Sequence, residues 1–217
     1  MKHYLATLYM LSMSSSILMA SQTDFKEYDD IKKVKIISES SEIEITKSES
    51  GNNISRVEFT QDGSDPNSCH LTFTRNSDEL IILSKKRETS GLSFCRVCKV
   101  NFRIYTPSST DFEIEAGIGN LNMKGMLNSL YFKSGVGDVN LDYDALPETS
   151  KEIKLDIGKG NVTASFISKA NLRAQVGMPP FFSRFYNEFT ETTSDPLHYF
   201  VNGNMGWGSF DIKKKPQ

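Results

Sequence analysis

The chain is poor in the residues on which many enzymes and nucleic-acid-binding proteins depend. Of its three histidines only His70 and His198 lie beyond residue 20, and they are 128 positions apart. No Ser-His-Asp or Cys-His signature accompanies them, so we predict no catalytic residue and no cofactor. The formal net charge is −2, whereas a general nucleic-acid binder is strongly basic, so we predict no nucleic-acid partner.

Long apolar segments are missing after residue 20. Before it, the uncharged and largely apolar stretch LATLYMLSMSSSILMA (5–20) follows Lys2 and His3. It is short and rich in serine for a membrane span, and it is typical of a signal peptide. We predict a signal peptide at 1–20 and an exported protein without a stable membrane span, in the periplasm, outside the cell or on its surface. A retained anchor is the alternative, because Leu18 lies where a small residue is preferred.

Long helical patterns and low-complexity linkers are also absent, so we predict one all-β domain over residues 21–217. Three segments have the same plan of strand, Gly-x-Gly, Asn or Asp, and strand: FEIEAGIGNLNM (112–123), LYFKSGVGDVNL (130–141) and IKLDIGKGNVTA (153–164). Their first glycines are 18 and then 23 residues apart. A period near 20 residues indicates a parallel β-helix or similar solenoid, with one coil of short strands per repeat.

Alternation in these repeats predicts which side chains point into the core. The predicted inward residues are Phe112, Ile114, Leu121, Met123, Leu130, Phe132, Val139, Leu141, Ile153, Leu155, Val162 and Ala164. The glycines are predicted to form corners through positive φ angles, because a phosphate-binding Gly loop would open a helix instead. With a further unit, MGWGSFDI (205–212), the corner glycines are Gly117, Gly119, Gly135, Gly137, Gly158, Gly160, Gly206 and Gly208.

A small polar residue follows each second glycine: Asn120, Asp138, Asn161 and Ser209. In stacked coils these side chains would form a column that hydrogen-bonds nearby backbone. A calcium site is the alternative, but Ca²⁺ takes about six to eight oxygens, and one carboxylate among amides is a weak donor set. We therefore predict a structural ladder and no metal site.

Other stretches are less regular. VKIISESSEIEIT (34–46) resembles a degenerate coil with Ser40-Ser41-Glu42 at its corner, and the loops 62–68 and 86–92 suit hairpin connections. Residues 172–177 begin like another coil, which Pro179-Pro180 interrupts. The aromatic residues that follow have the spacing of one helix face. We predict a short helical or apolar capping excursion near 179–190, or alternatively a partner surface, formed by Phe181, Phe182, Phe185, Tyr186 and Phe189.

Three cysteines leave one thiol unpaired if a single bridge forms in an oxidising compartment. Cys98 shares its parity with Val100 and Phe102, and Cys69 shares that of neighbouring apolar residues, so both should point inward. We predict a Cys69–Cys98 disulfide. A bridge that includes Cys95, or a zinc site with Cys69, His70, Cys95 and Cys98, are the alternatives; zinc is disfavoured because the CxxC lies in an extended segment.

The repeats AGIGNLNM, SGVGDVNL and DIGKGNVTA, preceded by NFRIYTP (101–107), resemble the bacterial putative adhesins of the DUF4097 family. The resemblance covers roughly residues 30 to 214. It implies an all-β, right-handed coil in the cell envelope or on the cell surface, and no settled activity. The chain departs from the family pattern in its Pro- and Phe-rich segment 178–190 and in its cysteines.

We therefore expect a non-enzymatic adhesin-like, binding or structural module whose partner is a protein or glycan of the envelope. A carbohydrate-active solenoid enzyme is the first alternative, for which Glu113, Glu115, Asp138, Asp142, Asp144 and Asp156 are the available carboxylates. A regulatory or envelope-stress protein that acts through a partner is the second.

The export prediction is tested by mass spectrometry of the protein recovered from its host. We expect an N-terminus at or near Ser21, because a signal peptidase would cut after Ala20. An intact Met1 on protein recovered from the cytoplasm would contradict it.

Overall fold

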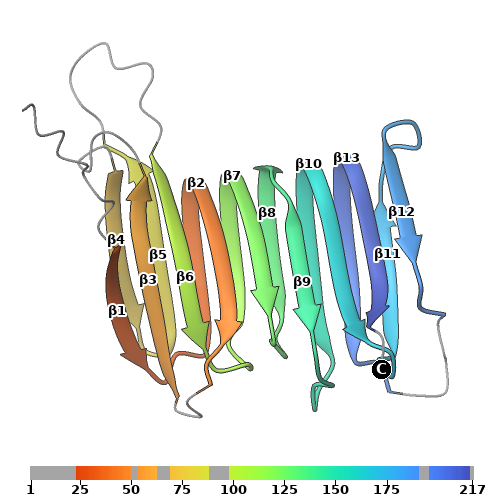
Figure 1. Ribbon diagram of the computed structural model, residues 1–217, viewed down its shortest axis with the longest axis horizontal. Coiled ribbons are helices and arrows are strands. Elements are labelled where there is room, and N and C mark those ends of the chain that lie inside the picture. Colours follow the sequence, from red (N-terminus) through yellow and green to blue (C-terminus); the bar gives the residue numbers. More distant parts are fainter. Residues whose placement is uncertain (1–22, 50–52, 63–68, 88–97, 191–195, 216–217) are drawn as a thin grey trace, which may run out of the picture.

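The computed structural model describes residues 23–49, 53–62, 69–87, 98–190 and 196–215, and these residues form strands and loops without any helix. The all-β prediction is confirmed, and no described helix could cross a membrane. Thirteen strands join in one mixed sheet (Figure 1). They are β1 (Thr23–Asp29), β2 (Lys33–Lys47), β3 (Ile54–Asp62), β4 (Cys69–Asn76), β5 (Glu79–Lys86), β6 (Lys99–Thr106), β7 (Asp111–Lys124), β8 (Leu130–Val136), β9 (Val139–Tyr143), β10 (Lys151–Ile167), β11 (Leu172–Gly177), β12 (Ser183–Asn187) and β13 (Tyr199–Lys215).

The four long strands, β2, β7, β10 and β13, each bend at a corner, and their two halves have different neighbours. The first half of β7 pairs with β8, whereas its second half pairs with β9. The sheet therefore folds over on itself into two facing layers (Figure 1). The first layer holds β4, β5, β8, β11 and the first halves of the long strands. The second layer holds β1, β3, β6, β9, β12 and the second halves.

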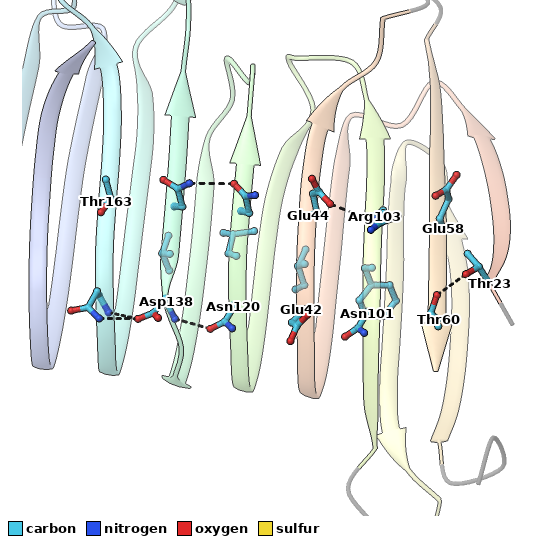
Figure 2. A pocket seen from close by; sticks show the side chains of 17 residues that line it. Thr23, Glu42, Glu44, Glu58, Thr60, Asn101, Arg103, Asn120, Asp138 and Thr163 are labelled. Carbon is cyan, nitrogen blue, oxygen red and sulfur yellow. Dashed lines mark hydrogen bonds and ion pairs between the residues drawn. The ribbon is translucent and has the colours of Figure 1, made fainter. Parts of the chain in front are cut away.

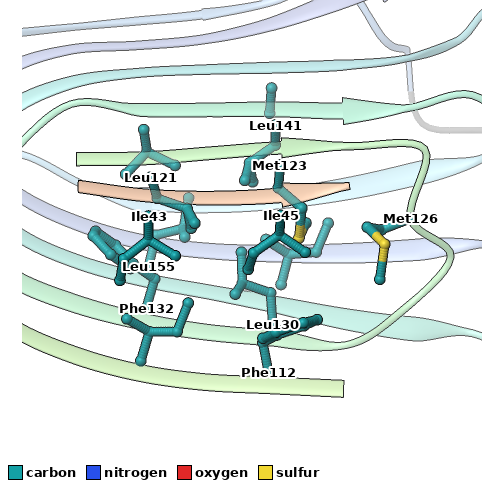
Figure 3. Close-up of a cluster of buried hydrophobic side chains, with 14 of the residues drawn as sticks. Ile43, Ile45, Phe112, Leu121, Met123, Met126, Leu130, Phe132, Leu141 and Leu155 are labelled. Carbon is teal, nitrogen blue, oxygen red and sulfur yellow. The ribbon is translucent and has the colours of Figure 1, made fainter. Parts of the chain in front are cut away.

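The core lies between these layers. Leu121 and Met123 from the second layer point toward Phe112 from the first (Figure 3). All twelve repeat residues predicted to point inward are buried, which confirms the prediction from alternation. Near the C-terminal end the core becomes aromatic, where the Tyr143 ring stacks 5.0 Å from that of Phe166.

The repeats form parallel rungs, as predicted, but their order in space differs from their order in the chain. β13 pairs with β10 on one side and with β11 and β12 on the other, always in parallel. β13 thus lies between β10, which is the third repeat, and the strands β11 and β12, which come after β10 in the sequence. Ser209 consequently lies beside Asn161.

The N-terminal third departs from the parallel coil. β2 is a rung parallel to β7, but the pairs β1–β3, β3–β6 and β4–β5 are antiparallel. The predicted hairpins at 62–68 and 86–92 are wrong, because β3 does not pair with β4 and β5 does not pair with β6. The tight hairpin is instead at Ser77, between β4 and β5, where φ is 58°. Serine, asparagine and aspartate around it supply the side chains that favour such turns.

The helix predicted near 179–190 is also wrong. Residues 183–187 form β12, which pairs in parallel with residues 208–212 of β13. The aromatic spacing suggested a helical face, but β13 offers an unpaired edge whose backbone groups bond those of β12. The segment is an apolar excursion at the end of the coil.

Most corner glycines are explained by close backbone approach. A Cβ atom on Gly117 would lie 2.8 Å from the Glu39 carbonyl oxygen, and one on Gly135 would lie 2.8 Å from the Gly117 oxygen. Gly158 and Gly206 make the same contact with the backbone oxygen of the neighbouring rung. The rungs therefore approach each other closely at positions where there is no Cβ atom. The predicted positive φ angle occurs, among these eight glycines, at Gly160 (157°) and Gly208 (138°).

The predicted Cys69–Cys98 disulfide is confirmed, with 5.1 Å between the Cα atoms. It joins the start of β4 in the first layer to the residue before β6 in the second. Closing a segment with a sequence separation of 29 residues stabilises the fold by about 3–4 kcal/mol on the chain-entropy model. Cys95 lies outside the described residues.

We expect Gly135→Ala to destabilise the fold by about 1–3 kcal/mol, the cost of forcing an extra methyl group into a close-packed site. The reason is the backbone oxygen of Gly117 at 2.8 Å from the added Cβ. Denaturant unfolding measures the change. The exposed Lys133→Ala, two residues away, is the control and should stay within about 0.5 kcal/mol. Equal effects of the two substitutions would contradict the close approach.

Candidate ligand-binding face

The outer surface of the second layer is hollowed into a groove of about 780 Å³. It crosses β1, β3, β6, β2, β7, β9 and β10 (Figure 2). Its polar lining residues are Thr23, Glu42, Glu44, Glu58, Thr60, Asn101, Arg103, Asn120, Asn122, Asp138, Asn140, Asn161 and Thr163. The groove is therefore rich in amides, hydroxyls and carboxylates.

The strand register arranges these side chains in two rows that run across the strands. Thr60 is paired with Asn101, Asn101 with Glu42, and Glu42 with Asn120. We call this row 1, which consists of Thr23, Thr60, Asn101, Glu42, Asn120, Asp138, Asn161 and Ser209. Row 2 lies two residues further along each of the parallel rungs and consists of Glu58, Arg103, Glu44, Asn122, Asn140, Thr163 and Asp211. Figure 2 shows the residues of both rows that line the groove.

The predicted polar column forms the C-terminal half of row 1. Asn120 Oδ1 accepts from the Asp138 amide at 2.9 Å, and Asp138 Oδ1 accepts from the Asn161 amide at 2.8 Å. Ser209 Oγ lies 3.0 Å from Asn161 Oδ1. The part of the chain that the structure describes contains no group of three or more His, Cys, Asp or Glu side chains arranged to hold a metal ion. The column is a hydrogen-bonded ladder that ties neighbouring rungs together.

The carboxylates of the groove are already engaged. Glu42 pairs with Lys99 at 3.0 Å, Glu44 with Arg103 at 3.4 Å, and Glu58 with Arg56 at 2.9 Å. Asp138 is held by the Asn161 amide and side chain. Chemically, this surface can exchange hydrogen bonds with a ligand at many points, with little free charge of either sign.

The six carboxylates that the sequence offers for a carbohydrate-active enzyme do not form one cluster. Of that set, only Asp138 lines the groove. Glu113, Glu115 and Asp156 lie on strands of the first layer, on the opposite side of the core. The groove instead contains Glu42, Glu44 and Glu58, none of which is among the carboxylates predicted from the sequence.

Several other groove residues were also missed: Asn101, Arg103, Asn122 and Asn140. Alternation in NFRIY and in the repeats marks each of them as outward-facing. That signal identifies them as surface residues. It could not reveal that β2 lies between β6 and β7, because β2 is distant from both in sequence.

The five aromatic residues of the predicted partner surface separate in the structure. Phe189 is buried, with its ring edge-on to that of Phe166. Phe181, Phe182, Phe185 and Tyr186 are exposed at the C-terminal end of the coil; Phe181 retains 89% of its accessible surface. The Phe182 ring lies 5.2 Å from that of Trp207, another exposed aromatic residue.

Neither a family model nor a curated protein matches this chain. Solved structures do. A putative cell adhesion protein from Clostridium sporogenes ATCC 15579 superposes with a TM-score of 0.68 at 14% identity, covering 90% of this chain and 100% of that one. The chain shares its fold. A putative adhesin from Bacteroides fragilis NCTC 9343 gives a TM-score of 0.46 at 12% identity, over 89% of this chain and 98% of that one.

The opposite outer surface, on the first layer, carries a charged cluster. Glu113 accepts hydrogen bonds from Lys33 Nζ at 2.6 Å and from Lys35 Nζ at 2.5 Å. These bonds lower the pKa of Glu113 and raise the pKa of both lysines. The cluster links β2 to β7 on the outer surface of the first layer.

We expect Glu113→Gln to cost about 0.5–1 kcal/mol near neutral pH, the scale of partly exposed ion pairs. Because the pKa of Glu113 is lowered on folding, its contribution is present above the usual value of 4.5 and is lost as the pH falls through the lowered value. The lysine contribution is lost at the alkaline end, as the pH rises above 10.5. The unfolding free energies of the wild type and of Glu113→Gln, measured between pH 2 and pH 7, should therefore differ near neutral pH and become equal in acid. The exposed Glu148→Gln is the control, and a difference that persists at the lowest pH would contradict the assignment.

Proposed function

We propose that this is an exported, non-enzymatic binding protein of the cell envelope or surface, of adhesin type, and that its groove holds a neutral glycan. The single observation that supports the glycan is the composition of the groove: two rows of amide, hydroxyl and neutralised carboxylate groups on a rigid sheet. The repeats that resemble DUF4097 adhesins, and the fold shared with a putative cell adhesion protein, are consistent with this proposal.

Export is supported by the disulfide and by the apolar N-terminal segment. Cys69 and Cys98 bridge the two layers inside the core. Such a bond persists in oxidising compartments and is rare in the cytosol. The segment at 5–20 supplies the expected signal, and the periplasm, the medium and the cell surface all meet the redox requirement.

A neutral polyhydroxylated ligand fits the groove better than a charged one. An asparagine side chain carries two donors and one acceptor. The ladder uses the oxygens of Asn120 and Asn161, and the remaining groups match hydroxyls, which also donate and accept. A polyanion would meet Glu42, Glu44, Glu58 and Asp138 with Arg103 as the one cationic lining residue. Nucleic acids need the opposite balance. Adjacent strands are about 4.8 Å apart, a spacing comparable to the size of one sugar ring, so a chain could follow the rows across the strands.

A carbohydrate-active enzyme is the second candidate, because carboxylates are present in the groove. Hydrolysis needs one carboxyl group as an acid and another as a base or nucleophile on opposite sides of the bond. Glu42, Glu44 and Glu58 each contact a cation of the protein instead, which engages the carboxylate oxygens that catalysis would need. A regulatory protein that binds a partner protein is the third candidate.

Binding of defined oligosaccharides tests the proposal. Neutral chains such as cello- and chito-oligosaccharides are compared with anionic polygalacturonate by isothermal titration calorimetry. We expect binding of at least one neutral chain, and an affinity at least about tenfold weaker for the double variant Asn122→Ala, Asn140→Ala, since loss of several groove hydrogen bonds removes about 1–2 kcal/mol. Their mutual hydrogen bond is long, at 3.4 Å, so the sheet should tolerate the change.

The matched control is Lys133→Ala with Lys154→Ala on the outer surface of the first layer, which should leave the affinity unchanged. Equal losses in both double variants would refute the groove as the site. Release of new reducing ends from a bound chain would show that the protein cleaves glycans, and would favour the enzyme over the binding protein. Binding of polygalacturonate alone would refute the neutral ligand.

A further inference from the structure

β12 presents an unprotected edge at the C-terminal end of the second layer. Among the described strands it pairs with β13 alone. Edge strands are usually protected from other chains by charges, proline or a covering segment. β1, at the other end of the same layer, follows this rule with Asp24, Lys26, Glu27 and Asp29. β12 instead carries Phe185 and Tyr186, which retain 43% and 50% of their accessible surface.

The backbone of β12 shows which groups face this open edge. The Glu188 amide donates to the Ile212 oxygen at 3.0 Å, and the Phe182 oxygen accepts from Gly208 at 3.2 Å. In a parallel pair, alternate residues bond the neighbouring strand. Even-numbered residues therefore face β13, and Ser183, Phe185 and Asn187 direct their N–H and C=O groups outward. These are the groups that a further strand would bond.

We propose that a second copy of this chain occupies the edge, with the two β12 strands antiparallel about a two-fold axis at Phe185. In this register Phe185 forms a hydrogen-bonded pair with Phe185 of the second copy, and Ser183 pairs with Asn187. Such residue pairs exchange both backbone hydrogen bonds in an antiparallel ladder. The second layer thus continues from one copy into the other.

The side chains of β12 are self-complementary in that register. Phe185 faces inward, 6.1 Å from the Phe210 ring, and would extend the apolar core toward its counterpart. Arg184 and Tyr186 lie on the outer side, where each Arg184 would meet Tyr186 of the other copy. An arginine over a tyrosine ring is a favourable pair. The contact is isologous, so it closes at two copies.

Charge favours a second copy over a strongly charged partner. The one formal charge on residues 183–187 is Arg184, which pairs with Asp211 of the same chain at 3.2 Å. Two such edges approach without net repulsion. Joining β12 to β1 of another copy would instead set aromatic residues against a charged strand and would propagate without closure.

The test uses proline at one edge-facing amide. Asn187→Pro removes an outward N–H and no bond to β13, and Asn187→Ala is the matched control. Both substitutions remove the side-chain oxygen that accepts from the Phe189 amide at 3.0 Å. They differ in the edge N–H and in the φ angle that the proline ring fixes. Sedimentation equilibrium of the purified full chain should give a dimer for the wild type and for Asn187→Ala. For Asn187→Pro the dissociation constant should rise at least about tenfold.

Hydrogen exchange resolved by residue supplies a second measurement, which also reports whether each variant is folded. The Phe185 amide should be protected at concentrations where the dimer forms, and should exchange freely in Asn187→Pro while the β10 amides stay protected. A wild type that is monomeric throughout, or a dimer equally stable in Asn187→Pro, would overturn the proposal. So would a dimer with a freely exchanging Phe185 amide. Protection of that amide only when an added extended peptide is bound would assign the edge to a different partner.

Discussion

The close approach of backbone to backbone at the corners is the constraint on which the rest of the molecule depends. At Gly117, Gly135, Gly158 and Gly206 there is no room for a Cβ beneath the carbonyl oxygen of the adjacent rung. A slip of one residue would put the larger Ile118 or Val136 at these points. It would also turn every inward side chain of that rung outward. The glycines therefore fix the register in which the rungs stack.

That register produces the core and the groove together. Leu121 and Val139 are paired in this register. The next pair along the two strands is Asn122 and Asn140, whose side chains point to the other side of the sheet. Burying the first pair stabilises the fold, since apolar area is removed from water. The second pair buries no comparable apolar area, but the register of the rungs fixes its position on the sheet. A rigid two-dimensional array of polar groups suits the binding of a ligand with little loss of protein flexibility.

The two ends of the coil are treated differently. At the N-terminal end the antiparallel strands β1, β3 and β4 complete the layers, and the Cys69–Cys98 bridge joins them. Charged side chains on β1 discourage further pairing. At the C-terminal end β11 and β12 are the outermost strands, and exposed aromatic side chains accompany them. Because of this asymmetry we propose different partners for the groove and for the C-terminal end of the coil.

The sequence by itself determined what is local. Alternation located the strands of the repeats and sorted their side chains into buried and exposed, because a strand turns each successive residue to the opposite face. Shared parity was enough to pair Cys69 with Cys98. Only the tertiary structure decided which strands became neighbours. It placed β13 between β10 and β11, and it made residues 183–187 a strand instead of a helix. It also placed β2 between β6 and β7, so that polar residues of the three strands line one groove. These outcomes depend on hydrogen bonds and packing between strands that are distant in sequence, and these interactions override the local pattern.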